Sequence, residues 1–403
     1  MRRSDGFAGS TRVLYLLTDE VSAVLVRGQL GFVHHEGFEV TAAARLADPG
    51  RPGAEWDRGV TVEHLPFVRQ PSPGRDLLAL WATIRLIRRV RPAIVNASTP
   101  KAGLLGMLAA RLTRVPVRVY VVRGLRFETA AGWRRRVLRS LERVAVTAAT
   151  HVVFNSASLL AVAERDGVIA PGRGEVIAAG SGNGVDAERF ATAALPGHGD
   201  ARRRLGVPAE ATVIGFVGRF THDKGIADLV DAVGSLRADR PGLHLLLVGQ
   251  FEHGDPVAAR VRAAIDPDHD HDHDHDPDHD HVTVVPWLDD TAVAYRAMDV
   301  LAFPSYREGL PNVPLEAQLC EVPVVGYAAT GTVDAVDAGR TGVLVPTGDT
   351  GALAGALAEL VDDAGRRREL GRQGPPWVLA NFDRAALWRA WAERYRRWAA
   401  VAP

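Results

Sequence analysis

The sequence of 403 residues has only one cysteine and lacks any long uninterrupted apolar run. The single Cys320 excludes an internal disulfide, and its apolar neighbours favour a packing role in a reducing compartment. One of the longest apolar stretches, residues 144–154, contains Thr and His and is too short to cross a bilayer. The first residues do not have the pattern of a secretory signal peptide. These absences predict a cytoplasmic protein.

The formal net charge is zero, but the chain outside residues 266–280 is basic. Eight of the 48 acidic residues are aspartates within residues 266–280, so 40 acidic residues elsewhere face 48 Lys and Arg. An excess of about eight positive charges favours phosphate-bearing ligands or an anionic membrane surface as partners.

Those aspartates alternate with histidines in a low-complexity segment, residues 267–281. Six of the 14 histidines lie there, and His and Asp are ligands of transition metals. The alternation, however, fixes no coordination geometry and has no packed shell of residues to orient it. We expect a solvated insertion, with adventitious metal binding as the alternative, and we predict no functional metal site in the chain.

Short apolar runs alternate with helical patterns along the whole sequence. This alternation predicts an α/β fold with parallel sheets covered by helices on both faces. The expected strands are residues 12–18, 38–43, 93–97, 117–122, 151–155, 213–217, 243–248, 282–286, 300–303, 324–327 and 343–345. The main expected helices are residues 21–36, 76–89, 101–112, 133–146, 158–166, 257–265, 350–362 and 385–401.

The length of the chain exceeds what one hydrophobic core usually supports, so we expect two domains. Residues 191–200 are rich in Ala, Gly and Pro and read as a linker. The expected domains are residues 1–195 and 196–378, followed by a terminal segment over residues 379–403. Two doubly wound, Rossmann-like sheets in series predict a ligand-binding cleft at the carboxyl ends of their strands.

The stretch from Phe303 to Pro323 carries the most specific pattern, because it follows a strand and opens a helix. We expect Asn312 to cap this helix, so that the backbone of Gly309 and Leu310 and the helix start form an anion site. Glu308 precedes the turn and Glu316 lies inside the helix, so the two carboxylates can reach different parts of one ligand. In isolation, solvated or capping glutamates would explain the pattern equally well.

A second stretch, residues 214–225, places two cations after another strand. The strand ends at Gly218, and Arg219 and Lys224 follow on the loop before a helix. Arg offers a planar fork and Lys a point charge, so together they can clamp a diphosphate. The plainer reading is that both are surface cations.

Together these stretches resemble the signature of the family-four retaining GT-B glycosyltransferases, or glycosyl transferases group 1, of the bacterial polysaccharide, glycoconjugate or natural-product type. The resemblance rests on a Ser-x-x-Glu-Gly-x-Pro frame followed by Glu-Ala, and on a Gly-Arg loop that ends in Lys-Gly about 90 residues earlier. It implies two Rossmann-like domains that face each other across a cleft.

The resemblance also implies roles for individual residues in the second half. Glu308 would contact the donor sugar and Glu316 the nucleotide ribose, while Gly309 and Leu310 meet the phosphates. Arg219 and Lys224 would form the diphosphate clamp at the end of the strand that closes with Gly218. Three further residues, in an Asn-Gly-Val-Asp segment and in a second glycine-bearing loop, would also lie near the donor: Asn183, Thr330 and Gly331.

The first half resembles the acceptor-side domain of the same family less closely. Thr99 and Lys101 follow one expected strand, and Arg123 follows the next, in a position where many relatives carry His. Gly28 lies where relatives have a glycine-rich loop. These four residues are the expected acceptor-side candidates.

The implied activity is retaining, metal-independent transfer of a sugar from a nucleotide-diphosphate donor, with UDP favoured and no cofactor. The acceptor would be a hydroxyl of a lipid-linked saccharide, a polysaccharide precursor or a secondary-metabolite scaffold. A nucleotide-sugar epimerase of the same architecture and a non-catalytic sugar-nucleotide-binding subunit are the alternatives. No aromatic-interleaved basic motif supports binding of nucleic acid.

Two amphipathic segments have more than one interpretation. Residues 133–143 carry five arginines around an apolar face, which fits either a solvated helix or contact with an anionic membrane at its inner face. Near the end, aromatic residues recur at three- and four-residue intervals and predict a buried stripe: Trp388, Trp391, Tyr395 and Trp398. The family resemblance implies that this last helix packs back on the first domain.

Overall fold

The computed structural model describes residues 10–48, 56–180, 182–190, 195–252, 254–265, 281–288 and 290–402. The chain divides into two compact units. Unit 1 comprises Met1–Gly184 and Arg384–Pro403, and unit 2 comprises Val185–Asp383. The expected tract at residues 267–281 lies outside the described residues except for His281.

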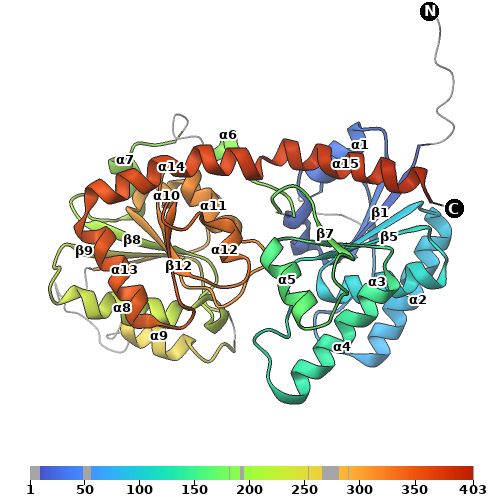
Figure 1. Cartoon of the computed structure of the whole chain (residues 1–403), viewed down its shortest axis with the longest axis horizontal. Helices are drawn as coiled ribbons and strands as arrows, with labels where there is room; N and C mark the ends of the chain where they lie inside the picture. The colour runs from blue at the N-terminus through green and yellow to red at the C-terminus, as the bar shows by residue number, and fades with distance from the viewer. Residues whose placement is uncertain are drawn as a thin grey trace, which may run out of the picture. The chain divides into compact units, whose positions relative to one another are not determined.

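Unit 1 is built on a seven-stranded sheet in the order β3-β2-β1-β4-β5-β6-β7, with parallel pairing throughout (Figure 1). Its strands are β1 (Arg12–Asp19), β2 (Glu39–Arg45), β3 (Thr61–His64), β4 (Ile94–Ser98), β5 (Val117–Val122), β6 (His151–Phe154) and β7 (Gly174–Val176). Its helices are η1 (Glu20–Val26), α1 (Gln29–His35), α2 (Pro73–Val90), α3 (Pro100–Leu112), α4 (Gly132–Ala148), α5 (Ala157–Arg165) and α15 (Arg384–Ala400).

Both faces of this sheet are covered, as the α/β prediction requires. Along β1, Leu14 and Leu16 belong to one apolar core, while Tyr15 and Leu17 belong to another on the opposite face. This alternation follows from the twofold side-chain period of a strand. Helices α2 to α5 contribute to the first core, whereas α1 and α15 contribute to the second.

Helix α15 completes the second core of unit 1 with its aromatic stripe. Trp391, Tyr395 and Trp398 are buried, which confirms the predicted core packing. The Tyr395 hydroxyl donates to the hydroxyl of Tyr15 (2.9 Å) and accepts a hydrogen bond from the Asn96 amide (2.6 Å). These bonds satisfy polar atoms that burial would otherwise penalise.

Unit 2 has a six-stranded parallel sheet in the order β10-β9-β8-β11-β12-β13. Its strands are β8 (Thr212–Val217), β9 (Leu243–Val248), β10 (Val282–Val285), β11 (Val300–Phe303), β12 (Val324–Tyr327) and β13 (Gly342–Val345). Its helices are α6 (Ala187–Phe190), α7 (His198–Leu205), η3 (His222–Lys224), α8 (Ile226–Arg237), α9 (Ala258–Ile265), α10 (Ala292–Ala297), α11 (Asn312–Leu319), α12 (Thr332–Ala335), α13 (Thr350–Asp362) and α14 (Ala364–Phe382).

Three sequence expectations need correction. The helix expected over residues 21–36 is two pieces, η1 and α1, because Gly28 adopts a φ of +80° between them. Residues 198–200 of the expected linker already belong to α7. Helix α14 was not expected, because Pro375 and Pro376 lie inside it. Among the described helices, none combines the length and apolar character that a membrane-crossing segment needs.

Candidate functional site

The candidate donor residues of unit 2 gather where three neighbouring strands end. The loops after β8, β11 and β12 carry most of them, and these strands are adjacent in the order β8-β11-β12. The chain winds from β8 toward β9 and β10 on one side and from β11 toward β12 and β13 on the other. The carboxyl ends of β8 and β11 therefore flank a topological switch point, where ligands of open α/β sheets bind.

An ion pair joins the first two of these loops. The ammonium of Lys224, at the end of η3, contacts the Oε1 atom of Glu308 after β11. Both side chains are largely shielded from solvent, with 22% and 14% exposed. Gly225 follows at a φ of +67°, and a Cβ there would lie 2.1 Å from the carbonyl oxygen of Pro304. Only glycine lets these two loops approach so closely.

The loop after β12 packs against the backbone of Glu308. The amide of Glu308 donates to the carbonyl of Thr330 (2.8 Å). Gly331 adopts a φ of +79°, and a Cβ there would come within 2.8 Å of the Glu308 carbonyl. Thr330 and Gly331 therefore fix the backbone that carries Glu308, although they come from another strand.

Helix α11 starts at Asn312 with Pro311 at the cap position and without a side-chain cap. The expected capping by Asn312 is therefore wrong, because Asn312 is already the first helical residue. Gly309 and Leu310 are buried residues immediately before this start. The structure thus keeps them at the amino end of α11, where the helix dipole favours an anion.

Glu316 lies inside α11 and is held from a neighbouring helix. The Tyr295 hydroxyl of α10 donates to its Oε2 atom (2.8 Å). Burial raises the pKa of the Glu316 carboxyl, while the hydrogen bond from Tyr295 and the charge of Arg189 act in the opposite direction. The side chain is therefore oriented, and it retains an acceptor oxygen for a hydroxyl ligand.

The other cation of the expected clamp has an acidic partner that the sequence did not reveal. Arg219 follows Gly218 after β8, and its guanidinium contacts Glu252 beyond the neighbouring strand β9. The Gly218 amide donates to the carbonyl of Val248 at the end of β9 (2.9 Å). The signal for Glu252 was its position after a strand that lies next to β8, but the order of strands is not visible in the sequence.

Two more polar contacts around these loops were missed. The Arg307 guanidinium donates to Asp223 (2.7 Å) and thereby joins the β11 loop to η3. Asp228 of α8 accepts hydrogen bonds from the hydroxyls of Tyr306 and Tyr327 (2.7 Å each). All of these contacts stiffen the loops that carry the candidate residues.

The remaining donor candidate, Asn183, lies in unit 1. Its side-chain amide donates to the carbonyl of Arg27 (3.0 Å), and the indole of Trp388 donates to its Oδ1 and carbonyl oxygens (3.0 Å each). Gly28 lies beside the same indole, because a Cβ on it would meet the Trp388 ring at 2.5 Å. In unit 1 both residues thus pack against α15.

Two acceptor-side candidates lie at the turn from β4 into α3. Thr99 holds a φ of +77°, an unfavourable conformation for a β-branched residue, and shares a hydrogen bond with Thr18 at the end of β1 (2.7 Å). The Lys101 ammonium contacts Asp76 (2.7 Å) and the carbonyl of Gln70 (2.5 Å). Backbone strain of this kind often marks functional positions.

Arg123 follows β5 and lies near Tyr395 and Tyr15. Burial lowers its pKa to about 10, while the nearby Tyr395 and Tyr15 raise it. Its Nε atom is buried without a hydrogen-bond partner among the described residues. A Cβ on Gly182 would lie 2.0 Å from its guanidinium, so the glycine leaves room for this side chain.

The sheets and the unit 2 site define the class of this protein. Two doubly wound units, one with a cation and a carboxylate set at a topological switch point beside a helix start, have the architecture of glycosyltransferases of the GT-B fold. Within the described part of the chain, no three His, Cys, Asp or Glu residues lie close enough to hold a metal ion.

Comparison with known proteins gives the family. Residues 211–363 match the family described as glycosyl transferases group 1, and residues 26–180 match the glycosyl transferase 4-like domain. The chain is 31% identical over 384 residues to the capsular polysaccharide biosynthesis glycosyltransferase CapM of Staphylococcus aureus, which covers 95% of this chain and 96% of that protein. The chain therefore belongs to the group 1 glycosyl transferases.

Solved structures agree with this fold. Sucrose-phosphate synthase from Thermosynechococcus elongatus superposes with a TM-score of 0.81 at 23% identity, covering 97% of this chain and 100% of that one. Anabaena HepE in complex with UDP-glucose gives a TM-score of 0.74 at 21% identity, covering 96% and 99%. These likenesses confirm the two Rossmann-like parallel-sheet domains of the GT-B fold. The Staphylococcus aureus relative is a glycosyltransferase and gives no support to the epimerase alternative.

Proposed function

We propose that this glycosyltransferase moves a sugar, with retention of anomeric configuration and without a metal ion, from a UDP-sugar to an acceptor hydroxyl. The observation that carries the proposal is the Lys224–Glu308 ion pair at the switch point, held by the backbone of Thr330 and Gly331. It sets a cation and a sugar-binding carboxylate side by side at the amino end of α11.

The chemistry required of these residues is mainly electrostatic. As the acceptor oxygen bonds to the anomeric carbon, the bond from that carbon to the diphosphate oxygen breaks, and the diphosphate takes up the acceptor proton. Lys224, Arg219 and the start of α11 offset the charge that develops on the leaving diphosphate. Glu308 holds the sugar hydroxyls, and Glu316 accepts from the ribose. Attack from the face that the diphosphate leaves gives retention.

The proposed donor and the proposed acceptor are supported by different comparisons. A UDP donor is supported by the fold shared with HepE, whose structure contains UDP-glucose. A lipid-linked saccharide or polysaccharide precursor as acceptor is supported by the likeness to a capsular polysaccharide glycosyltransferase. A small secondary-metabolite scaffold is the other acceptor class. We place the enzyme in the cytoplasm, where nucleotide-sugars are its co-substrates and no cofactor is needed.

The lysine content of the chain allows a direct test. Lys224 and Lys101 are the only lysines in the sequence. Mass spectrometry after treatment with an amine-reactive reagent therefore has to follow the modification of only two side chains. We expect UDP to slow the modification of Lys224 and to leave the slower modification of Lys101, which is paired with Asp76, unchanged. A panel of nucleoside diphosphates and their sugars in a thermal-shift assay should give the largest stabilisation with UDP species. Protection of neither lysine, together with no thermal shift by any nucleotide, would refute the donor site.

A further inference from the structure

The exposed apolar side chains of the chain are concentrated on three neighbouring helices of unit 1. Of 15 large hydrophobic residues that are exposed in the described structure, eight lie on α2, α3 and α4. Each of the eight has between 43% and 72% of its surface exposed. We call this set the α2–α4 apolar surface: Leu77, Leu78, Trp81, Leu112, Trp133, Val137, Leu141 and Val144.

On α4 these residues form a stripe that the core does not use. Trp133, Val137, Leu141 and Val144 recur at three- and four-residue intervals, so they share one side of the helix. The residues that α4 buries are Glu142, Ala145, Val146 and Ala148. The stripe is therefore a second, exposed apolar face, and such faces mark surfaces that bind a partner.

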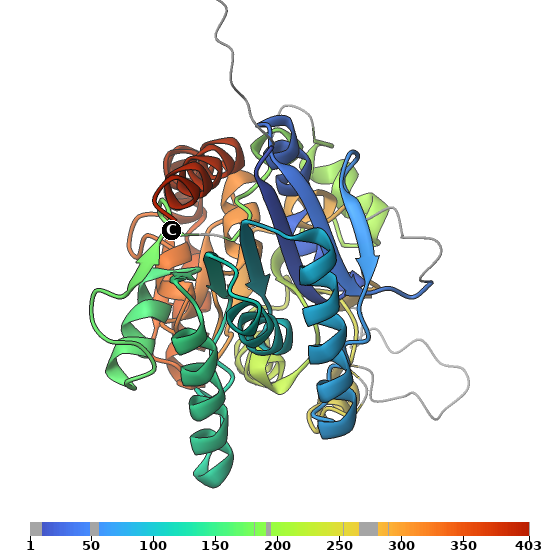
Figure 2. The same cartoon turned by 90° about the vertical axis from the view of Figure 1, so that its right-hand side faces the viewer.

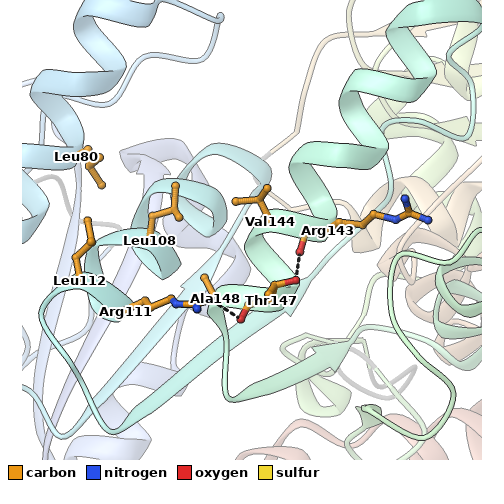
Figure 3. Close-up of a pocket in the computed structure, with 8 residues that line it drawn as sticks. All are labelled: Leu80, Leu108, Arg111, Leu112, Arg143, Val144, Thr147 and Ala148. Atoms are coloured by element: carbon orange, nitrogen blue, oxygen red, sulfur yellow. Dashed lines mark hydrogen bonds between the residues drawn. The ribbon is translucent and has the colours of Figure 1, made fainter.

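A groove joins this stripe to the exposed residues of α2. Helices α2 and α4 each pack against α3, and Figure 2 shows both extending beyond the body of the unit on the same side of the sheet. Between them lies a groove of about 530 Å³. Figure 3 shows Leu80 of α2, Leu108 and Leu112 of α3 and Val144 of α4 around it. The groove makes the surface continuous across all three helices.

The same helices are strongly basic. They carry eleven Arg and Lys residues against two carboxylates, Asp76 and Glu142. Asp76 is paired with Lys101, and Glu142 is buried and accepts a hydrogen bond from Tyr120 (2.7 Å). Among the described residues, Arg134 and Arg136 are exposed beside the stripe and have no acidic partner.

We propose that the α2–α4 apolar surface docks on an anionic phospholipid bilayer, with the stripe and the groove in the acyl boundary and the arginines at the headgroups. Exposed apolar residues with arginines beside them match the two components of such an interface. Binding of a second copy of the chain would bring two basic surfaces together, and their positive charges would repel each other. Nucleic acid would pair with the arginines but would leave the Trp, Leu and Val stripe without a partner.

Vesicle flotation with the full chain tests the proposal. We expect binding to phosphatidylcholine vesicles that contain phosphatidylglycerol, and little binding to phosphatidylcholine alone. The triple variant Trp133→Ser/Val137→Ser/Leu141→Ser should lose about tenfold or more in partition. The variant Arg134→Gln/Arg136→Gln should lose about fivefold for each arginine on anionic vesicles. The matched control is Val284→Ser/Trp287→Ser, which removes exposed apolar side chains of unit 2 and should bind like the wild type.

Several results would overturn the proposal. They are no flotation of the wild type with anionic vesicles, equal flotation of the stripe variant, or a dimer in size-exclusion chromatography that the stripe variant alone dissociates. Unchanged melting by circular dichroism identifies variants that fold. Vesicle binding is measured without nucleotide, and UDP protection of Lys224 without vesicles, so failure of this proposal and of the donor site are distinguished.

Discussion

The ammonium of Lys224 and the carboxylate of Glu308, 84 positions apart in the sequence, meet between the ends of strands β8 and β11. The pair is shielded, and Gly225 and Gly331 hold the backbone on both sides of it. On the proposed function, a donor that places its phosphate at Lys224 and its sugar at Glu308 would take over this pairing, so the ion pair would hold both side chains in position before the donor binds.

Replacement of Lys224 should abolish most of the transfer activity. We expect Lys224→Ala to lower kcat about 100- to 1000-fold, because it removes charge stabilisation of the leaving diphosphate. Lys224→Arg should recover little, since a planar guanidinium does not fit the place of a compact ammonium. Turnover of a UDP-sugar with a lipid-linked acceptor measures the effect, and Arg260→Gln on α9 serves as the control. Wild-type kcat in Lys224→Ala would contradict the assignment.

Arg219 and its partner Glu252 should respond differently to substitution. Arg219→Ala removes the proposed phosphate contact and should cost about 100-fold in kcat. Glu252→Gln removes only an ion pair between two exposed side chains, so its effect should stay within about fivefold. Steady-state kinetics of the two variants decide between the roles. Equal losses of kcat in the two variants would show that the Arg219–Glu252 pair only stabilises the loops.

Glu316 should make nucleotide affinity depend on pH. Its pKa is raised by burial, and only the carboxylate accepts hydrogen bonds from both ribose hydroxyls, so UDP affinity should fall as the pH drops through that raised pKa. Glu316→Gln should weaken binding about 10- to 100-fold at neutral pH and flatten the profile. Isothermal titration calorimetry with UDP over a pH series measures both effects.

Tyr295→Phe gives a matched control for the Glu316 prediction. The Tyr295 hydroxyl lowers the pKa of Glu316, so its removal should shift the pH profile toward higher pH without flattening it. A flat profile in the wild type would show that Glu316 does not bind the ribose.

The strands were predictable because buried parallel strands read as continuous apolar runs. Strands β5, β9, β11 and β12 begin and end at the expected residues. Strand β3 was missed, since its four residues at the edge of the sheet are only partly buried and include Glu and His. Helix α14 was missed because Pro375 and Pro376 normally end a helix, whereas here the helix continues through both of them.

For the candidate site, the residues that follow each strand were predictable, but which strand ends lie next to one another was not. Arg219, Lys224 and Glu308 were selected because each follows a strand and precedes a helix, within motifs that resemble the family signature. Their partners were not, since Glu252 pairs with Arg219 across strands whose order the sequence does not reveal. The α2–α4 apolar surface was visible only as the basic amphipathic segment 133–143, because the exposure of α2 depends on how the helices pack.

The buried Glu142 should make unit 1 less stable at higher pH. Burial raises its pKa from 4.5 to about 7, so the folded state favours the protonated, neutral form. The contribution of Glu142 is most favourable below about pH 4.5 and is lost as the pH rises through 7. The loss should be on the order of 3 kcal/mol of the free energy of unfolding. Glu142→Gln should remove this dependence and be more stable than the wild type at pH 8.

Urea unfolding followed by tryptophan fluorescence at pH 5 and pH 8 measures the Glu142 effect. Six of the eight tryptophans lie in unit 1, so the signal reports mainly on that unit. The exposed Glu210 of unit 2 provides the control, because Glu210→Gln should follow the wild-type pH dependence. Parallel stability curves for the wild type and Glu142→Gln would show that this carboxyl keeps its charge when buried against Tyr120.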